Sequence, residues 1–499
     1  MKDSAVLGKQ HPTSIMFLKF FIILPLSVIS VGLIQKYLEK YPFTVIFNFM
    51  LIFFAVSFII LGIVILPFSS YIQVGKFWAR DLFADDKFKA CGLDFLFAFA
   101  LVFNEWTSSL LYVLSEMFGS LILSYFFMTF ANSLTTPDQS GRFVPLFYIF
   151  ANIALFSSGL LCKCVDGFRS GMSYEESEKI FNIFFVISGI LTFTIFGLKW
   201  YLEKYVTIKK LFIEKQVKEK KKKVKSTFSE GLIEMSKSRL LFFISLITLF
   251  YAASTNIIES SYKAALTYGA DIKDEAKGEY ARNLNSWEQI AVALAVIVIL
   301  LTPFPKLIKT KGWVYVAMVS PLLTLFSTLG TLILAWYNYP ITNKESSIFL
   351  DRFTAKDNSK VVLENIIGII SVALMKIHKY AAFDITKEAL AMRIDESKRA
   401  QYKSIFDGIF GKLGKSIGSI YAIVMLGILN GRDIRKAAPI SFVILVFFCI
   451  VWIYAVKYLD RKYNESIQKN TPIDIDLFTK GKNQNLMVET PSKSVKTDF

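Results

Sequence analysis

Histidine and cysteine are scarce in this sequence, and the shortage limits the chemistry that the chain can support. Among its 499 residues are two histidines and four cysteines, namely His11, His378, Cys91, Cys162, Cys164 and Cys449. Cys162 and Cys164 have no histidine nearby, so the ligand spacing of a zinc site is not met. We expect neither a metal site nor a cofactor. An alternative from another class, a polytopic membrane enzyme or scramblase, would need clustered acid, base or metal-binding residues, and the sequence has no such cluster.

We also expect no cleavable signal peptide, because Lys19 and Pro25 interrupt the first apolar run and no small-residue cleavage site follows it. What the chain has in excess is apolar residues. Of its residues, 54% are hydrophobic and 48 are phenylalanine, and the mean hydropathy is +0.47. A soluble protein of this length would carry more charge. The composition therefore predicts an all-α polytopic membrane protein.

Apolar runs of about 20 residues, long enough to cross a bilayer, recur along nearly the whole sequence. We expect about eleven spans, near residues 14–35, 44–67, 106–131, 143–162, 180–200, 240–260, 287–304, 312–337, 361–383, 404–429 and 438–457. Segment 72–104 mixes charged and apolar residues and is interpreted as a lateral amphipathic helix. The charged stretch 339–360 is predicted to be an extramembrane loop.

Much of the net charge of +17 lies in residues 209–225 and in the tail after Lys457. Basic segments beside membrane spans mark the cytoplasmic side, and we favour this interpretation over binding of nucleic acid or anionic lipid. The chain then divides into an N-terminal bundle of about five spans, a basic cytoplasmic linker, a C-terminal bundle of about six spans and a polar cytoplasmic tail. These parts are residues 1–200, 201–239, 240–457 and 458–499.

The two halves show weak internal similarity, as expected when a transporter is built from two repeated bundles. Segments 142–159 and 399–418 are each a helix rich in small residues that follows a short acidic turn. The glycines of the second segment also have a simpler explanation, because small residues let helices approach closely. An odd number of spans is awkward for such a repeat and would place residues 1–13 outside. We therefore expect that a first span is absent from this chain.

Four charged residues lie inside predicted spans, where an ionised side chain costs from about 3 to more than 10 kcal/mol. They are Lys19, Glu116, Glu259 and Lys415. Two bases and two acids distributed over both halves suggest a central cavity for a charged solute. Structural explanations stay open for three of them. Lys19 is close enough to a helix end to snorkel, Glu116 could pair with a buried base, and Glu259 lies near the end of its span.

Lys415 lies in the segment GKLGKS, which does not fit a P-loop. The glycine that such a loop requires five residues before its GK pair is Ile409 here, and the context is a membrane helix. A lysine among glycines can still bind phosphate as a point charge.

Several blocks resemble the ATP:ADP antiporters of plastids and of obligate intracellular parasites of rickettsial, chlamydial and microsporidian type. In chain order they are FLK and LP at 17–25, SEMFG at 115–119, FAN at 130–132, RFVPLFYIFANIAL from 142, TNIIESSYK at 255–263, KYAAFDITK at 379–387 and LGKS at 413–416. The resemblance implies a major-facilitator-like transporter of two bundles, for which the family has twelve spans.

By this resemblance, the family's transport-essential residues fall on Lys19, Glu116, Glu259 and Lys415. A second set is expected to support them, namely Asn132, Asn256, Lys379, Asp384 and Lys387. For the last three, an ion-pair network at a helix end is the default explanation. The sequence departs from the family pattern at Phe118, Tyr262 and the Ile417-Gly418 pair, which leaves nucleotide selectivity open.

The resemblance implies exchange of ATP for ADP by alternating access, with phosphate or other nucleotides as further solutes. Proton-coupled uptake, or a broader importer of purine nucleotides or organic anions, is the alternative within transport. We expect a monomer in a lipid bilayer with no nucleic-acid partner, located in the cell membrane of an intracellular parasite or in a reduced mitochondrial or plastid-type organelle. An empty cavity would hold lysine charge without a counter-ion, which would make reorientation costly and exchange obligatory.

Overall fold

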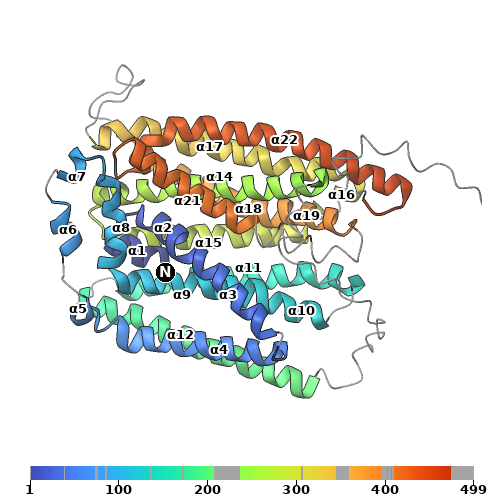
Figure 1. The fold of residues 1–499 in the computed structure, drawn as a ribbon, viewed down its shortest axis with the longest axis horizontal. Coiled ribbons are helices and arrows are strands. Elements are labelled where there is room, and N and C mark those ends of the chain that lie inside the picture. Colours follow the sequence, from blue (N-terminus) through green and yellow to red (C-terminus); the bar gives the residue numbers. More distant parts are fainter. Residues whose placement is uncertain are drawn as a thin grey trace, which may run out of the picture.

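The computed structural model describes residues 2–38, 40–73, 77–84, 87–134, 137–169, 174–206, 237–304, 307–343, 359–394, 402, 406 and 410–473. Every element in this part of the chain is a helix. The long helices run roughly parallel to one another across Figure 1, as expected for apolar segments that satisfy their own backbone hydrogen bonds inside a bilayer.

The N-terminal half supplies the helices that precede the basic linker. It begins with α1 (Lys2–Lys9), α2 (Ser14–Phe17), the π-helix η1 (Leu18–Ile23), α3 (Leu24–Leu38), α4 (Phe43–Ile60) and η2 (Leu61–Ile65). It ends with α9 (Trp106–Phe118), η4 (Gly119–Phe127), α10 (Met128–Leu134), α11 (Pro137–Arg169), α12 (Tyr174–Tyr201) and η5 (Leu202–Val206).

Most of the C-terminal half lies above it in Figure 1. Its helices are α14 (Arg239–Lys273), α15 (Lys277–Leu301), α16 (Leu307–Thr310), α17 (Trp313–Asn343), α18 (Val361–His378), η7 (Lys379–Phe383), α19 (Asp384–Ala391), α21 (Gly411–Ile428), η9 (Ile434–Ala437) and α22 (Ala438–Lys469).

Ten helices of the described part are long and apolar enough to cross a membrane, which confirms the polytopic all-α prediction. They correspond to every predicted span except 404–429. That span is represented by α21, which carries Lys412 and Lys415 in its first turns and is not among the ten. Within 404–410 only residues 406 and 410 are described.

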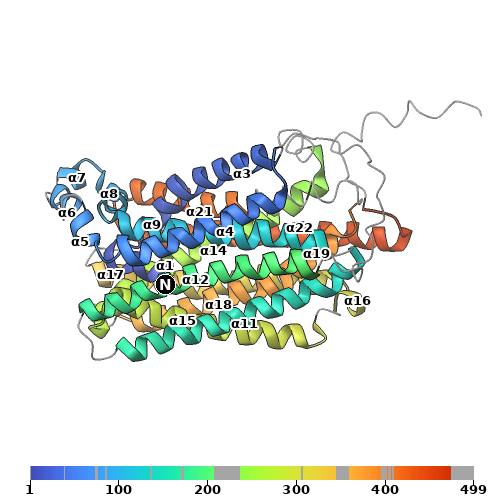
Figure 2. The same cartoon turned by 90° about the horizontal axis from the view of Figure 1, so that it is seen from below.

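Segment 72–104 differs from the single lateral helix that was expected. The structure breaks it into α5 (Ser69–Ile72), α6 (Trp78–Leu82), α7 (Lys87–Ala90), η3 (Asp94–Leu96) and α8 (Phe97–Asn104). Gly92 has a φ of +71°, a conformation that an α-helix does not allow, so the chain turns there. These short helices lie together at one end of the bundle in both views, opposite α16 (Figures 1 and 2).

Several helices continue beyond their predicted ends, and α14 and α22 do so furthest. Another, α17, runs to Asn343, into the stretch 339–360 that was predicted to be a loop. The helix α14 extends past residue 260 to Lys273, because Ala264, Ala265 and Leu266 bury an apolar face that the polar residues near Glu259 had hidden in the sequence. Likewise α22 continues past residue 457 to Lys469, into the segment assigned to the tail, and buries Leu459 there.

The start of the chain is placed differently from expectation. No span or helix was predicted before residue 14, but residues 2–9 form α1, which packs against α9 and α15. Val6 and Leu7 are fully buried. Gly8 and Gly278 allow this packing, since a Cβ built on Gly278 would lie 2.9 Å from the Ser4 carbonyl oxygen. The helix α1 is thus packed into the bundle.

Glycines also bring α21 against α14. A Cβ on Gly414 would lie 2.6 Å from the carbonyl oxygen of Leu249, and one on Gly418 would lie 3.0 Å from Cβ of Asn256. The close approach expected from small residues is therefore confirmed here. It positions Lys415, between the two glycines, beside the middle of α14.

Candidate functional site

The four charged residues predicted from the sequence converge on one site between the halves. Lys19 lies in η1, Glu116 in α9, Glu259 in α14 and Lys415 in α21. Nζ of Lys19 is 3.6 Å from Oε2 of Glu259, and Nζ of Lys415 is 3.9 Å from Oε1 of Glu116. Each glutamate is therefore paired with a lysine of the opposite half.

Three further charged residues join this cluster. Lys2 of α1 forms an ion pair with Glu116, and its ammonium lies 5.2 Å from the centre of the buried Tyr112 ring. Nζ of Lys263 is 2.8 Å from Oε1 of Glu259 and 3.1 Å from Oδ1 of Asp3. Each glutamate thus has two lysine partners.

Sequence reasoning missed these three residues. Lys2 and Asp3 were overlooked because they precede the first predicted span, which begins at residue 14. Lys263 gave a usable signal, since it follows Glu259 at the i, i+4 spacing that places two side chains on the same helix face. The charged cluster, as the term is used below, consists of Lys2, Asp3, Lys19, Glu116, Glu259, Lys263 and Lys415.

Asn256, from the second predicted set, contacts the charged cluster. The Lys19 ammonium donates a hydrogen bond of 2.7 Å to its Oδ1. Its Nδ2 donates to the Lys415 carbonyl at 2.7 Å and to Oγ of Ser419 at 2.8 Å. Asn256 therefore links a lysine of the N-terminal half to the backbone of α21.

The contacts described for Lys379, Asp384 and Lys387 lie outside the charged cluster. Lys387 pairs with Asp384 at 3.3 Å, and the Lys379 ammonium lies 4.9 Å from the centre of the Tyr380 ring. These contacts are local to η7 and α19, as the ion-pair explanation predicted. The side chain of Asn132 lies outside the described residues.

The positions that depart from the family pattern have packing roles. The Phe118 ring makes edge contacts with Phe54 and Phe58, each at 5.5 Å between ring centres. Tyr262 is 2% exposed, and its ring lies 2.5 Å from where a Cβ on Gly368 would be. Both aromatic side chains fill helix interfaces, whereas Ile417 is partly exposed.

Exposure divides the lysines of the cluster into two kinds. The side chains of Lys263 and Lys19 are 6% and 14% exposed, whereas those of Lys2 and Lys415 are 34% and 61% exposed. With all groups ionised, four lysines face three carboxylates, so the cluster carries one excess positive charge. Accessible cations inside a membrane bundle suit an anionic solute.

The backbone near the cluster departs from α-helical geometry. Lys19 lies in η1, and η4 begins at Gly119, less than one turn after Glu116. Such π-helical stretches are uncommon and are often found at functional sites. Here the π-helical turns change the direction in which side chains point along the helices that carry Lys19 and Glu116.

Hydrogen bonds and ion pairs also join the halves at the α5–α8 end. Arg432 donates from Nη2 to Oδ1 of Asp94 at 2.6 Å and from Nε to Oδ2 at 2.9 Å. Arg282 of α15 pairs with Asp166 of α11. The buried Arg435 pairs with Asp433 at 2.8 Å and with Glu364 at 3.2 Å. These last contacts fix the turn that presents Arg432.

His11 lies outside the spans, in the turn between α1 and α2. Its Nδ1 is 2.8 Å from Oγ1 of Thr13. Burial lowers the pKa of His11 to about 4, although the nearby Asp433 carboxylate acts in the opposite direction. The imidazole is therefore neutral at physiological pH.

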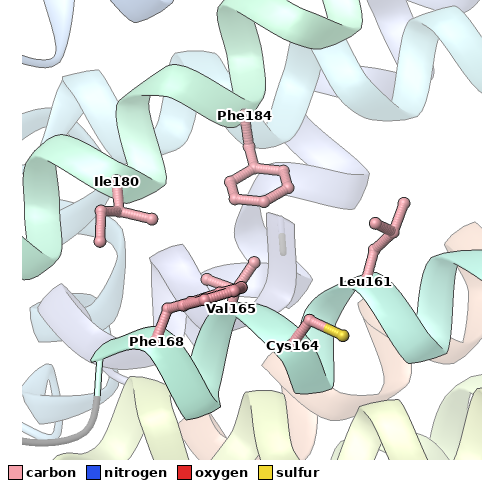
Figure 3. Close-up of a pocket in the computed structure, with 6 residues that line it drawn as sticks. All are labelled: Leu161, Cys164, Val165, Phe168, Ile180 and Phe184. Carbon is pink, nitrogen blue, oxygen red and sulfur yellow. The ribbon is translucent and has the colours of Figure 1, made fainter.

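An apolar cavity of about 340 Å³ lies elsewhere, between α11 and α12. Figure 3 shows its lining, which consists of Leu161, Cys164, Val165, Phe168, Ile180 and Phe184. These side chains offer no charged group to an anion. The cavity is therefore unsuited to a charged solute, and the charged cluster remains the candidate site.

The family model of the TLC ATP/ADP transporters matches residues 1–463. The chain belongs to this family. ADP,ATP carrier protein 1 of Encephalitozoon cuniculi (strain GB-M1) is 37% identical over 494 residues, covering 99% of this chain and 88% of that protein. ADP,ATP carrier protein 3 of the same organism is 34% identical over 479 residues, covering 96% and 88%.

More distant relatives come from bacteria. ADP,ATP carrier protein 4 of Rickettsia bellii (strain RML369-C) is 24% identical over 474 residues, covering 94% of this chain and 87% of that protein. The family and the ten apolar helices together make the chain an integral multi-pass membrane transporter rather than an enzyme. The family predicted from the sequence is therefore confirmed.

Proposed function

We propose that this chain exchanges ATP for ADP across a membrane and that the charged cluster binds the nucleotide. Family membership supports the solute class. The charged cluster supports the location of the nucleotide site, because it brings four lysines to the contact between the two halves. Nucleotides carry several negative charges on their phosphates, which lysines bind as point charges.

The observation that carries this proposal is the reciprocal pairing of the two glutamates. Lys415 of the C-terminal half pairs with Glu116 of the N-terminal half, and Lys19 pairs with Glu259 in the opposite sense. An anion that competes for either lysine acts directly on a bond between the halves. Nucleotide binding is thereby linked to their relative movement.

This pairing changes the explanation of obligatory exchange. The sequence suggested that an empty site would leave lysines without counter-ions, yet the structure gives each of the four a carboxylate partner. In the revised account the empty transporter is held by cross-half ion pairs. Phosphates replace the glutamate partners of the cross-half lysines, which frees the halves to move, so the transporter reorients only when loaded.

Two ion pairs hold the halves together at the α5–α8 end. Asp94–Arg432 and Asp166–Arg282 join the halves there, beyond the cluster. If the basic linker is cytoplasmic, this end faces outward. In alternating access these contacts would break when the outward path opens.

Uptake of labelled ATP into liposomes that contain the purified chain tests the proposal. We expect rapid uptake when the liposomes are preloaded with ADP and little uptake when they are empty. Equal uptake into empty liposomes would contradict exchange. Uptake driven by a pH gradient without internal nucleotide would instead favour the proton-coupled alternative.

A further inference from the structure

The start of the chain is held in a defined position beside Glu116. Val6 and Leu7 anchor α1 in the core. Gln10 then donates hydrogen bonds from Nε2 to Oγ of Ser108 at 2.8 Å and of Ser109 at 2.9 Å, both on α9. Because Glu116 lies on the same helix, this anchoring fixes Lys2 relative to it.

Lys2 and Lys263 differ in what surrounds them. Lys263 is 6% exposed and lies between two carboxylates, those of Asp3 and Glu259, at 3.1 and 2.8 Å. Lys2 is 34% exposed and pairs with the single carboxylate of Glu116. Lys263 is therefore enclosed and its charge is balanced by two carboxylates, whereas Lys2 is accessible.

Glu116 lies between the two most exposed lysines of the cluster. Lys2 reaches it from α1 and Lys415 from α21, across the contact between the halves. A carboxylate held by two accessible cations occupies a place that an anionic phosphate oxygen can fill, since both ligands accept charge-assisted hydrogen bonds from ammonium groups.

We infer that Lys2 and Lys415 together bind the nucleotide phosphates, and that Glu116 is their counter-ion when the site is empty. This inference rests on the proposed function and names the two lysines of the charged cluster that contact the phosphates. Asp3 and Lys263 act as positioning residues, because their ion pair fixes α1 against α14. On binding, the phosphates displace Glu116 from both lysines, so the cross-half pair Lys415–Glu116 opens.

Two replacements of Lys2 separate binding from a structural role. Charge-assisted hydrogen bonds contribute about 1.5–3 kcal/mol, so Lys2→Gln should raise the KM for ATP about 10- to 100-fold. Lys2→Arg keeps the charge and should recover most of the loss. Lys9→Gln is the matched control, since it removes the same charge from the other end of α1, and its KM should stay near that of the unchanged chain.

Thermal unfolding with tripolyphosphate as the probe supplies an independent readout. Tripolyphosphate should raise the Tm of the unchanged chain and of Lys9→Gln, and should raise that of Lys2→Gln much less. If Lys2 were only structural, Lys2→Gln would lower the Tm without probe but keep the full shift with it. That result, or an unchanged KM, overturns the inference.

Failure of the proposed function gives a different result from failure of this inference. If the unchanged chain shows neither ATP/ADP exchange nor a tripolyphosphate shift, the proposed function fails and the inference fails with it. If the unchanged chain shows both and Lys2→Gln matches it in both, only the role of Lys2 is wrong.

Discussion

Lys19 and Glu259 lie 3.6 Å apart although they come from opposite sides of the basic linker. Their side chains are 14% and 23% exposed, so the pair is largely shielded from solvent. Asn256 and Lys263 complete the surroundings. The pair is one of the two direct charge contacts on which the proposed coupling between binding and movement depends.

A double-mutant cycle measures the coupling free energy between Lys19 and Glu259. Lys19→Gln and Glu259→Gln should each destabilise the chain by leaving a partner charge uncompensated, and the double variant should lose less than the sum of the two. Residues in direct contact show coupling of about 0.5–3 kcal/mol. Chemical denaturation of the purified variants in detergent provides the values. Strict additivity would mean that the ion pair contributes no stability.

Lys415 should be essential for exchange, because it is the most exposed lysine of the cluster and therefore the most accessible to a nucleotide. Lys415→Gln should reduce exchange of labelled ATP at least tenfold through loss of a charge-assisted bond to phosphate. Lys457→Gln, which removes the same charge from an exposed position on α22, is the control. Equal exchange by the two variants at equal amounts of folded protein would contradict the assignment.

The contact between α21 and α14 should tolerate a methyl group at one glycine and not at its neighbour. A Cβ at Gly414 would lie 2.6 Å from a backbone oxygen, whereas one at Gly411 would lie 4.0 Å from Cγ2 of Thr248. Gly414→Ala should therefore lower the free energy of unfolding by about 1–3 kcal/mol, and Gly411→Ala should not. Comparing their Tm values tests this packing, and similar values would contradict it.

His11 should make stability depend on pH in the acidic range. Its folded pKa of about 4 lies below the ordinary value of 6.5, so the unfolded chain binds the proton more readily. The stabilising contribution is complete above about pH 6.5 and is lost as the pH falls toward 4. The total is at most about 3 kcal/mol, and less because the ring is partly solvated.

Comparing the chain with His11→Gln isolates this effect from the titration of carboxylates. The difference in Tm between the two should be constant above pH 7 and should shrink, or change sign, between pH 6.5 and 4. A difference that stays constant down to pH 4 would show that His11 is protonated as easily in the folded chain as in the unfolded one.

Much of the fold could be predicted from length and apolarity alone. A run such as 44–67 has enough apolar residues to span a bilayer, and the structure turns it into α4 and η2. Helix ends were harder to predict, because Glu259 and Lys263 interrupt the apolar pattern of α14 although they face the interior of the bundle. The prediction of a single helix over 72–104 was wrong, because Gly92 breaks the helix that the amphipathic pattern suggested.

The candidate site could be predicted only in part. Charges inside apolar runs pointed to Lys19, Glu116, Glu259 and Lys415, since their desolvation cost demands an explanation. Their partners could not be read from the sequence, because Lys19 and Glu259 are brought together only when the halves pack. Lys2 escaped notice because α1 is too short to give a clear periodic signal.

A density map of the purified chain with bound ADP, compared with one without nucleotide, tests the central claim most directly. The account predicts phosphate density between Lys2 and Lys415, with Glu116 moved away from both and the Lys415–Glu116 separation longer than 3.9 Å. Nucleotide density at another place, with the pairs Lys415–Glu116 and Lys19–Glu259 intact, would contradict it.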